Sequence, residues 1–140
     1  MFAFYQEWKK NQERQRILLA FYEELKKNLE SYYVMDQLGR FRLFRLTIWS
    51  RLNEEALFAW DEPLVAYIRR LEEYNALLDD FLKYEQWYAS DINNKTPATA
   101  RVLHDKREEP RQKFQGLEPV IKSAIQSFEK YLQEQKILKS

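Results

Sequence analysis

The sequence contains no cysteine, one histidine, two glycines and four prolines. The absence of cysteine excludes disulfides, thiolate catalysis and cysteine-bound metals. Two isolated glycines cannot form a glycine-rich phosphate-binding loop. Turns between strands also draw on glycine and proline, so a sheet-rich fold is disfavoured. The abundant residues are instead Leu, Glu, Lys, Gln and Arg, which favour helices.

Long hydrophobic runs and a strong net charge are lacking as well. The longest uninterrupted apolar run, residues 17–22, is far shorter than the roughly 20 residues that span a bilayer, and the N-terminus has no signal-peptide features. The net charge is +1, so no overall field directs the chain to nucleic acid or to acidic lipid. Residues 52–92 carry three basic and ten acidic side chains, and we expect an acidic central helix beside two basic ones.

Apolar residues recur at helical spacing in three long segments, residues 2–38, 61–90 and 117–138. Start and stop signals flank them: Gly39 after the first, Asp61 with Pro63 at the second, and Gly116 with Pro119 at the third. The sequence therefore predicts an all-α fold, an up-down helical bundle of three long helices plus one or two short ones. Residues 1–140 form a single domain in this interpretation, with residues 1–16 as a protruding N-terminal extension of the first helix.

Two weaker segments provide the short helices. Thr47 can cap a helix over residues 48–57, and Thr96 with Pro97 begins another. The second is poorly patterned, and Pro110 is expected to limit any helix through it.

No constellation for catalysis is visible. The single histidine, His104, lies in a charged run, and no Glu-x-x-His pair occurs. Metal sites usually need several converging ligands, and a catalytic triad needs a partner base. We therefore expect a non-enzymatic protein with no metal and no cofactor.

The N-terminus combines aromatic and basic residues. Phe4, Tyr5 and Trp8 fall on one helical face together with Met1. Basic residues follow them, namely Lys9, Lys10, Arg14 and Arg16. Such a face is typical of a membrane-interface segment and equally of a dimer contact. In a third interpretation the aromatics pack on Trp60, on Trp87 or on a neighbouring chain.

The stretch LGRFRLFRLTIWSRL, residues 38–52, interleaves four arginines with aromatic residues. The arginines are Arg40, Arg42, Arg45 and Arg51. Basic groups bind phosphates and aromatics stack on bases, so the stretch could contact nucleic acid. We favour a connector that closes one end of the bundle. That interpretation predicts that Phe44, Leu46 and Trp49 are buried and that at least one arginine pairs with a carboxylate.

Two asparagines occupy apolar rows of the predicted helices. Asn28 lies in the first helix and Asn75 in the second, although asparagine is a poor helix former. Buried amides are normally hydrogen-bonded. We expect this buried polar pair either to meet each other or to bond the backbone of residues 40–60. A polar ligand pocket is the alternative.

Three elements carry a resemblance to other proteins: EELKKNLE, the connector ending in RLTIW, and EPLVAYIRRLEEYNALLDDF. Together they resemble a loose group of uncharacterised bacterial helical proteins. The matching positions are Glu24, Leu25, Asn28, Leu29, Thr47, Trp49, Asn75, Leu77 and Leu78. The spacing departs at one point, since Trp49 follows Thr47 by two residues rather than three. The resemblance implies a membrane-tethered helical domain, often preceded by a membrane anchor, and supplies no catalytic residue.

The sequence thus predicts a helical interaction or scaffold module whose partner is a protein, a second copy or a membrane surface. We expect it in the cytoplasm, at a membrane if the N-terminal segment binds one. Nucleic acid binding through residues 40–51 is the alternative function.

Overall fold

The structure, a computed structural model, describes residues 2–52 and 60–139, and within them every regular element is helical. The elements are α1 (Phe2–Leu38), η1 (Trp49–Arg51), α3 (Glu62–Ser90), η2 (Ile92–Asn94), α4 (Pro97–Phe114) and α5 (Leu117–Glu134). The predicted all-α bundle of long helices with short additional turns is confirmed.

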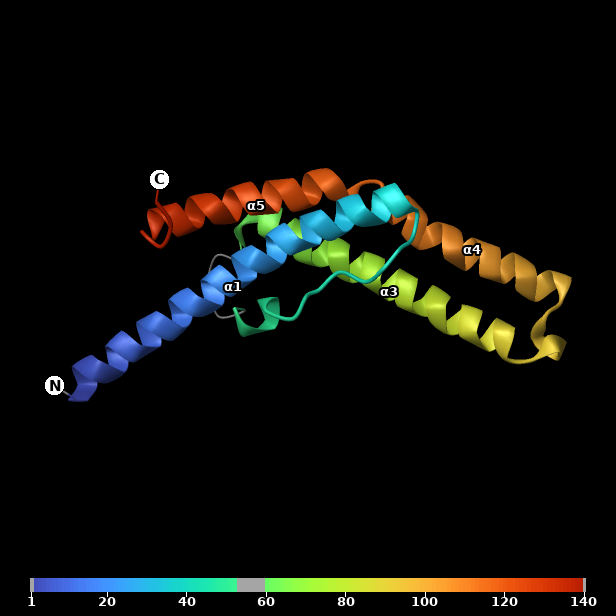
Figure 1. The fold of residues 1–140 in the computed structure, drawn as a ribbon, viewed down its shortest axis with the longest axis horizontal. Helices are drawn as coiled ribbons and strands as arrows, with labels where there is room; N and C mark the ends of the chain where they lie inside the picture. Colours follow the sequence, from blue (N-terminus) through green and yellow to red (C-terminus); the bar gives the residue numbers. More distant parts are fainter. Residues whose placement is uncertain (1, 53–59, 140) are drawn as a thin grey trace.

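The helices form two parts (Figure 1). α1, α5 and the first half of α3 form a three-helix body, and α4 with the second half of α3 forms an arm. α5 packs along both α1 and the first half of α3, and α4 folds back along the second half of α3. α4 and α5 follow one another with a break at Gln115 and Gly116. The N-terminal end of α1 projects away from the other helices. This layout leaves two parts of the chain outside the central core, the start of α1 and the tip of the arm.

Aromatic rings fill the centre of the body. Phe21 of α1 meets Phe128 of α5 edge-on at 5.0 Å between ring centroids and Tyr67 of α3 at 6.3 Å. Nearer the arm, Tyr32 stacks on Phe114 at 4.4 Å. Such pairs add roughly 1 kcal/mol each beyond the area they bury. The buried core joins α1, α3, α4 and α5 through Leu18, Phe21, Leu25, Tyr32, Leu64, Tyr67, Leu71, Tyr74, Phe114, Ile121, Phe128 and Leu132.

The helix ends follow the sequence signals. Asp61 Oδ1 accepts from the Leu64 N–H at 3.1 Å and caps α3, while Asp61 Oδ2 accepts from Ser127 Oγ of α5 at 2.8 Å. Thr96 and Thr99 form a reciprocal capping box at the start of α4. Gly39 adopts φ +66°, a left-handed conformation that ends α1 with little strain because glycine has no Cβ.

Pro110 does not limit α4, which is a correction to the sequence-based expectation. The helix runs through it to Phe114, and the proline is buried. A proline inside a helix removes one backbone hydrogen bond, and the burial of the apolar ring opposes that loss. The predicted helix over residues 48–57 lies partly outside the described residues, and its described part is the 3-10 turn η1.

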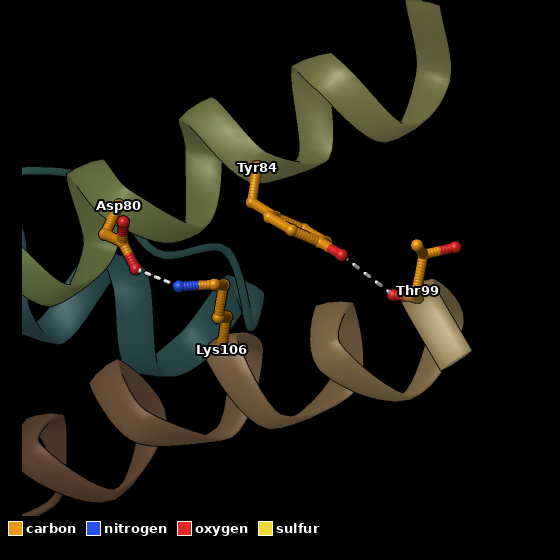
Figure 2. A network of polar contacts seen from close by, with 4 residues as sticks. All are labelled: Asp80, Tyr84, Thr99 and Lys106. Atoms are coloured by element: carbon orange, nitrogen blue, oxygen red, sulfur yellow. Dashed lines mark hydrogen bonds and ion pairs between the residues drawn. The ribbon is translucent and has the colours of Figure 1, made fainter. Parts of the chain in front are cut away.

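Polar contacts also join α4 to the second half of α3 (Figure 2). Lys106 Nζ of α4 binds Asp80 Oδ2 of α3 at 2.6 Å, and Tyr84 Oη donates to the Thr99 carbonyl at 3.5 Å. Exposed ion pairs of this kind contribute little, about 0 to 1 kcal/mol. The arm depends more on Leu78 and Phe81, which are buried.

None of the described helices combines the length and hydrophobicity that a membrane crossing requires.

Replacing Phe128 with Ala tests the aromatic core. The ring is fully buried, so the substitution should lower the free energy of unfolding by about 3 to 5 kcal/mol. Phe4→Ala is the matched control, because Phe4 is 78% exposed and should change stability by less than about 0.5 kcal/mol. Urea denaturation followed by circular dichroism measures both, and equal losses would contradict the described core.

Candidate functional site

The connector, residues 40–48, runs back alongside α1 and crosses α3; it is an extended chain as far as residue 46 and bends at residues 47 and 48 (Figure 1). No strand pairs with it among residues 2–52 and 60–139. An extended chain needs partners for its backbone N–H and C=O groups where it is buried. Those partners come from side chains of α1 and α3.

Two asparagines bind successive residues of the connector. Asn75 Oδ1 accepts from the Phe44 N–H at 2.9 Å, and Asn75 Nδ2 donates to the Phe44 carbonyl at 2.9 Å. Asn28 binds Arg45 in the same two-point manner, with its Oδ1 accepting from the N–H at 3.2 Å and its Nδ2 donating to the carbonyl at 2.8 Å. Each amide therefore substitutes for one peptide unit of a neighbouring strand. Of the two arrangements expected for the pair, the structure shows the bonds to backbone.

The two asparagines differ in burial. Asn28 is 2% exposed, and its Nδ2 also donates to Tyr67 Oη at 2.6 Å. Asn75 is half-buried rather than buried. Asn28 therefore lies in the interior, and Asn75 lies at its edge.

Glu24 binds the end of the connector. Its Oε1 accepts from the Thr47 N–H at 3.2 Å and from Thr47 Oγ1 at 2.9 Å, and its Oε2 accepts from the Ile48 N–H at 3.4 Å. Glu24 is only 6% exposed, so these donors replace the water that its carboxylate loses. They also orient the chain at the start of η1.

Two buried tyrosines complete the set that we call the clamp: Glu24, Asn28, Tyr67, Tyr74 and Asn75. Tyr74 Oη donates to the Arg42 carbonyl at 3.1 Å. Burial raises the pKa of Tyr74, and burial also raises that of Tyr67, although the hydrogen bond from Asn28 opposes the second shift. Both hydroxyls thus stay protonated over the physiological pH range and serve as hydrogen-bonding groups.

The side chains that follow the clamped backbone differ in how deeply they are buried. Phe44 is buried and tilts against Tyr74, with 5.2 Å between centroids. Leu46 and Trp49 are only partly buried, so the prediction that they are buried holds for Phe44 alone. The reason is geometric, because the bonds to Asn28 and Glu24 hold this part of the connector at the rim of the core.

The four arginines are exposed, and within the described residues none pairs with a carboxylate. No such pair is therefore present within residues 2–52 and 60–139, and two of the carboxylates expected as partners, Glu54 and Glu55, lie outside this described part of the chain. The acidic groups of α3 that do form ion pairs use lysines, such as Lys83 and Lys113.

A groove of about 640 Å³ lies between the connector and the second half of α1. Its basic lining residues are Lys27, Arg40, Arg42 and Arg45, and Glu30 is its one acidic lining residue. Arg51 is not part of this lining. The structure thus brings three of the four predicted arginines together and leaves the fourth apart.

The predicted N-terminal aromatic residues remain uncovered by the described chain. Phe4 is 78%, Tyr5 58% and Trp8 54% exposed. Tyr5 and Trp8 contact each other, with 6.2 Å between ring centroids. Trp60 and Trp87 are themselves exposed. Every described side chain from Ala3 to Glu13 is exposed. Arg14, within the predicted extension of residues 1–16, instead donates a hydrogen bond to Tyr131 Oη of α5 at 2.8 Å.

His104 is exposed on α4. Across the described ranges, no three His, Asp or Glu side chains are grouped so that they could hold a metal ion.

No protein-family model, curated protein or solved structure matches the chain. The resemblance to bacterial helical proteins remains a prediction. Four of the positions that carry it, Glu24, Asn28, Thr47 and Asn75, are the ones that join the connector to the helices. A structural role accounts for these four residues without any ligand.

Sequence reasoning missed Glu24, Tyr67 and Tyr74 as members of the clamp. One signal was available, since Glu24 precedes Asn28 by one helical turn and therefore shares its face.

Replacing Asn28 with Leu should destabilise the protein by about 3 kcal/mol, because partly buried backbone groups of Arg45 and the buried hydroxyl of Tyr67 lose their partner. Asn11→Leu is the same change at an exposed site of the same helix and should alter stability by less than about 0.5 kcal/mol. Urea denaturation measures both. A loss below about 1 kcal/mol for Asn28→Leu would show that the clamp contributes little.

The raised tyrosine pKa values predict a loss of stability in alkali. The pKa of Tyr74 in the folded protein lies above the usual 10.0. The contribution of this group to the free energy of unfolding is therefore complete below pH 10 and is lost as the pH rises further. Between pH 9 and 11 the ionisation of this tyrosine in the unfolded chain should lower the free energy of unfolding by about 1 kcal/mol. Tyr74→Phe should reduce the decline in unfolding free energy by that amount, whereas Tyr5→Phe, at an exposed site, should leave the decline unchanged.

Proposed function

We propose that the chain is a non-enzymatic helical interaction module that binds the surface of an anionic membrane through the projecting end of α1. The observation that carries the proposal is the exposure of Phe4, Tyr5 and Trp8 on a helix end that stands clear of the body (Figure 1). Clusters of exposed aromatics usually mark an interface.

The residue types favour a lipid interface. Tyrosine and tryptophan are enriched at the headgroup level of bilayers, where an apolar ring and a polar edge are both accommodated. Spacings of three and four residues place Tyr5, Trp8 and Phe4 in one sector of the helix. A helix that lies in the membrane plane would insert this sector among the headgroups.

The charges complement an anionic surface. Lys9, Lys10 and Arg16 are exposed and form no ion pair within the described residues. Each basic residue near an anionic bilayer contributes about 1 kcal/mol.

The same face is poorly suited to a second copy of this chain. Helix pairing needs an apolar seam that continues over several turns. Beyond Trp8, the face continues through Gln12 and Gln15 before Leu19. The two glutamines interrupt the seam, so the aromatic patch from Phe4 to Trp8 covers only about one and a half turns. A patch that short favours insertion into headgroups over a helix dimer.

Co-sedimentation with vesicles of phosphatidylcholine and phosphatidylglycerol tests the proposal. Replacing Phe4, Tyr5 and Trp8 with Ser should weaken binding at least about tenfold, because the rings then provide no apolar area. Trp60→Ser is the matched control, since Trp60 is another exposed tryptophan, and it should leave binding unchanged. Vesicles of phosphatidylcholine alone should bind more weakly than the mixed vesicles.

Two outcomes would contradict the proposal. One is vesicle binding that the triple variant leaves intact. The other is a doubled mass by light scattering that the triple variant abolishes, with no vesicle binding, which would assign the face to self-association.

A further inference from the structure

The groove between α1 and the connector is separate from the projecting aromatic face. It is lined from Lys27 to Leu38 on α1 and from Arg40 to Arg45 on the connector. Because its walls belong to the clamped part of the chain, its shape is held by the hydrogen bonds of Asn28 and of Tyr74.

The charged residues that line the groove are mostly basic. Four cations face one carboxylate, Glu30, and none of the four forms an ion pair within the described residues. Basic side chains gathered in a groove concentrate positive potential there and favour an anionic occupant.

Its apolar lining is aliphatic. Val34, Leu38 and Leu43 are 54%, 64% and 47% exposed. The aromatic residues of the connector face elsewhere, since Phe44 is buried and Phe41 packs at 4.9 Å on Phe114. Bases of single-stranded nucleic acid need exposed rings for stacking. Aliphatic side chains suit a peptide better.

The connector also offers main-chain groups. Leu43 lies between Arg42 and Phe44, whose main chains are hydrogen-bonded to the helices. In the described part of the chain its own N–H and C=O bond no other residue. An extended peptide can use such groups as a strand uses a sheet edge.

We propose that this groove binds an extended acidic peptide segment in which carboxylates alternate with aliphatic side chains. The carboxylates would bind Arg42 and Arg45, and the aliphatic residues would cover Leu38 and Leu43. The stretch of α1 that lines the groove is about 16 Å long, which corresponds to about five extended residues. This inference is independent of membrane binding.

Fluorescence anisotropy with rhodamine-labelled peptides and the full chain tests the proposal. The probe DLEVDLE should bind. NLQVNLQ, which lacks the charges, and DSESDSE, which lacks the aliphatic groups, should each bind at least about tenfold more weakly. Equal binding of DLEVDLE and NLQVNLQ, or no binding of DLEVDLE, would overturn the proposal.

Arginine variants test whether the peptide binds in the groove. Replacing Arg42 and Arg45 with Gln should weaken DLEVDLE binding at least about tenfold, and circular dichroism should show an unchanged fold, because the clamp bonds their main chain. Arg51→Gln is the matched control, because this exposed arginine belongs to η1 and is not part of the groove lining, and it should have no effect. An equal loss in both would overturn the assignment.

Two further probes distinguish an acidic peptide from other anionic ligands of the groove. A twelve-nucleotide oligo-dT should bind more weakly than DLEVDLE; tighter binding that the Arg42 and Arg45 variant abolishes would assign the groove to nucleic acid instead. Vesicle binding should change less than twofold in that variant, and its loss would assign these arginines to the membrane.

Discussion

The hydrogen bonds from asparagine side chains to an extended chain are the constraint on which the body of this protein depends. An unpaired strand inside a helical fold leaves backbone polar groups without partners, and each such group costs about 1 to 3 kcal/mol when buried. Asn28 and Asn75 approach the connector from two different helices and bind adjacent residues. α1 and α3 are thereby joined through the connector as well as by the direct contact of Phe21 with Tyr67.

The clamp has a consequence for the surface. With Phe44 held inward by the core, the neighbouring arginines at 42 and 45 are exposed and lie beside α1. A helical connector would distribute the same side chains around an axis. The extended form, together with the helix beside it, instead gathers them along one groove.

Aromatic residues have two separate roles along the chain. In the body they are buried in edge-on and stacked contacts, as in the pair of Phe21 and Phe128. At the start of α1 the same residue types stand in solvent. The difference lies in what surrounds them. Residues 117–134 form the helix that covers the middle of α1, whereas residues 3–13 extend beyond it (Figure 1).

Local signals in the sequence were sufficient for the helical class, the ends of α1 and α3, and the unusual status of Asn28 and Asn75, because capping and helical periodicity act over a few residues. The protruding start of α1 also followed from the polar stretch after Trp8. The course of the connector depended on contacts between residues far apart, such as Phe44 with Asn75, and no local pattern encodes those. Only the tertiary structure therefore decided that Asn28 and Asn75 bind backbone, that Pro110 is tolerated within a helix, and that three arginines share a groove while the fourth lies apart.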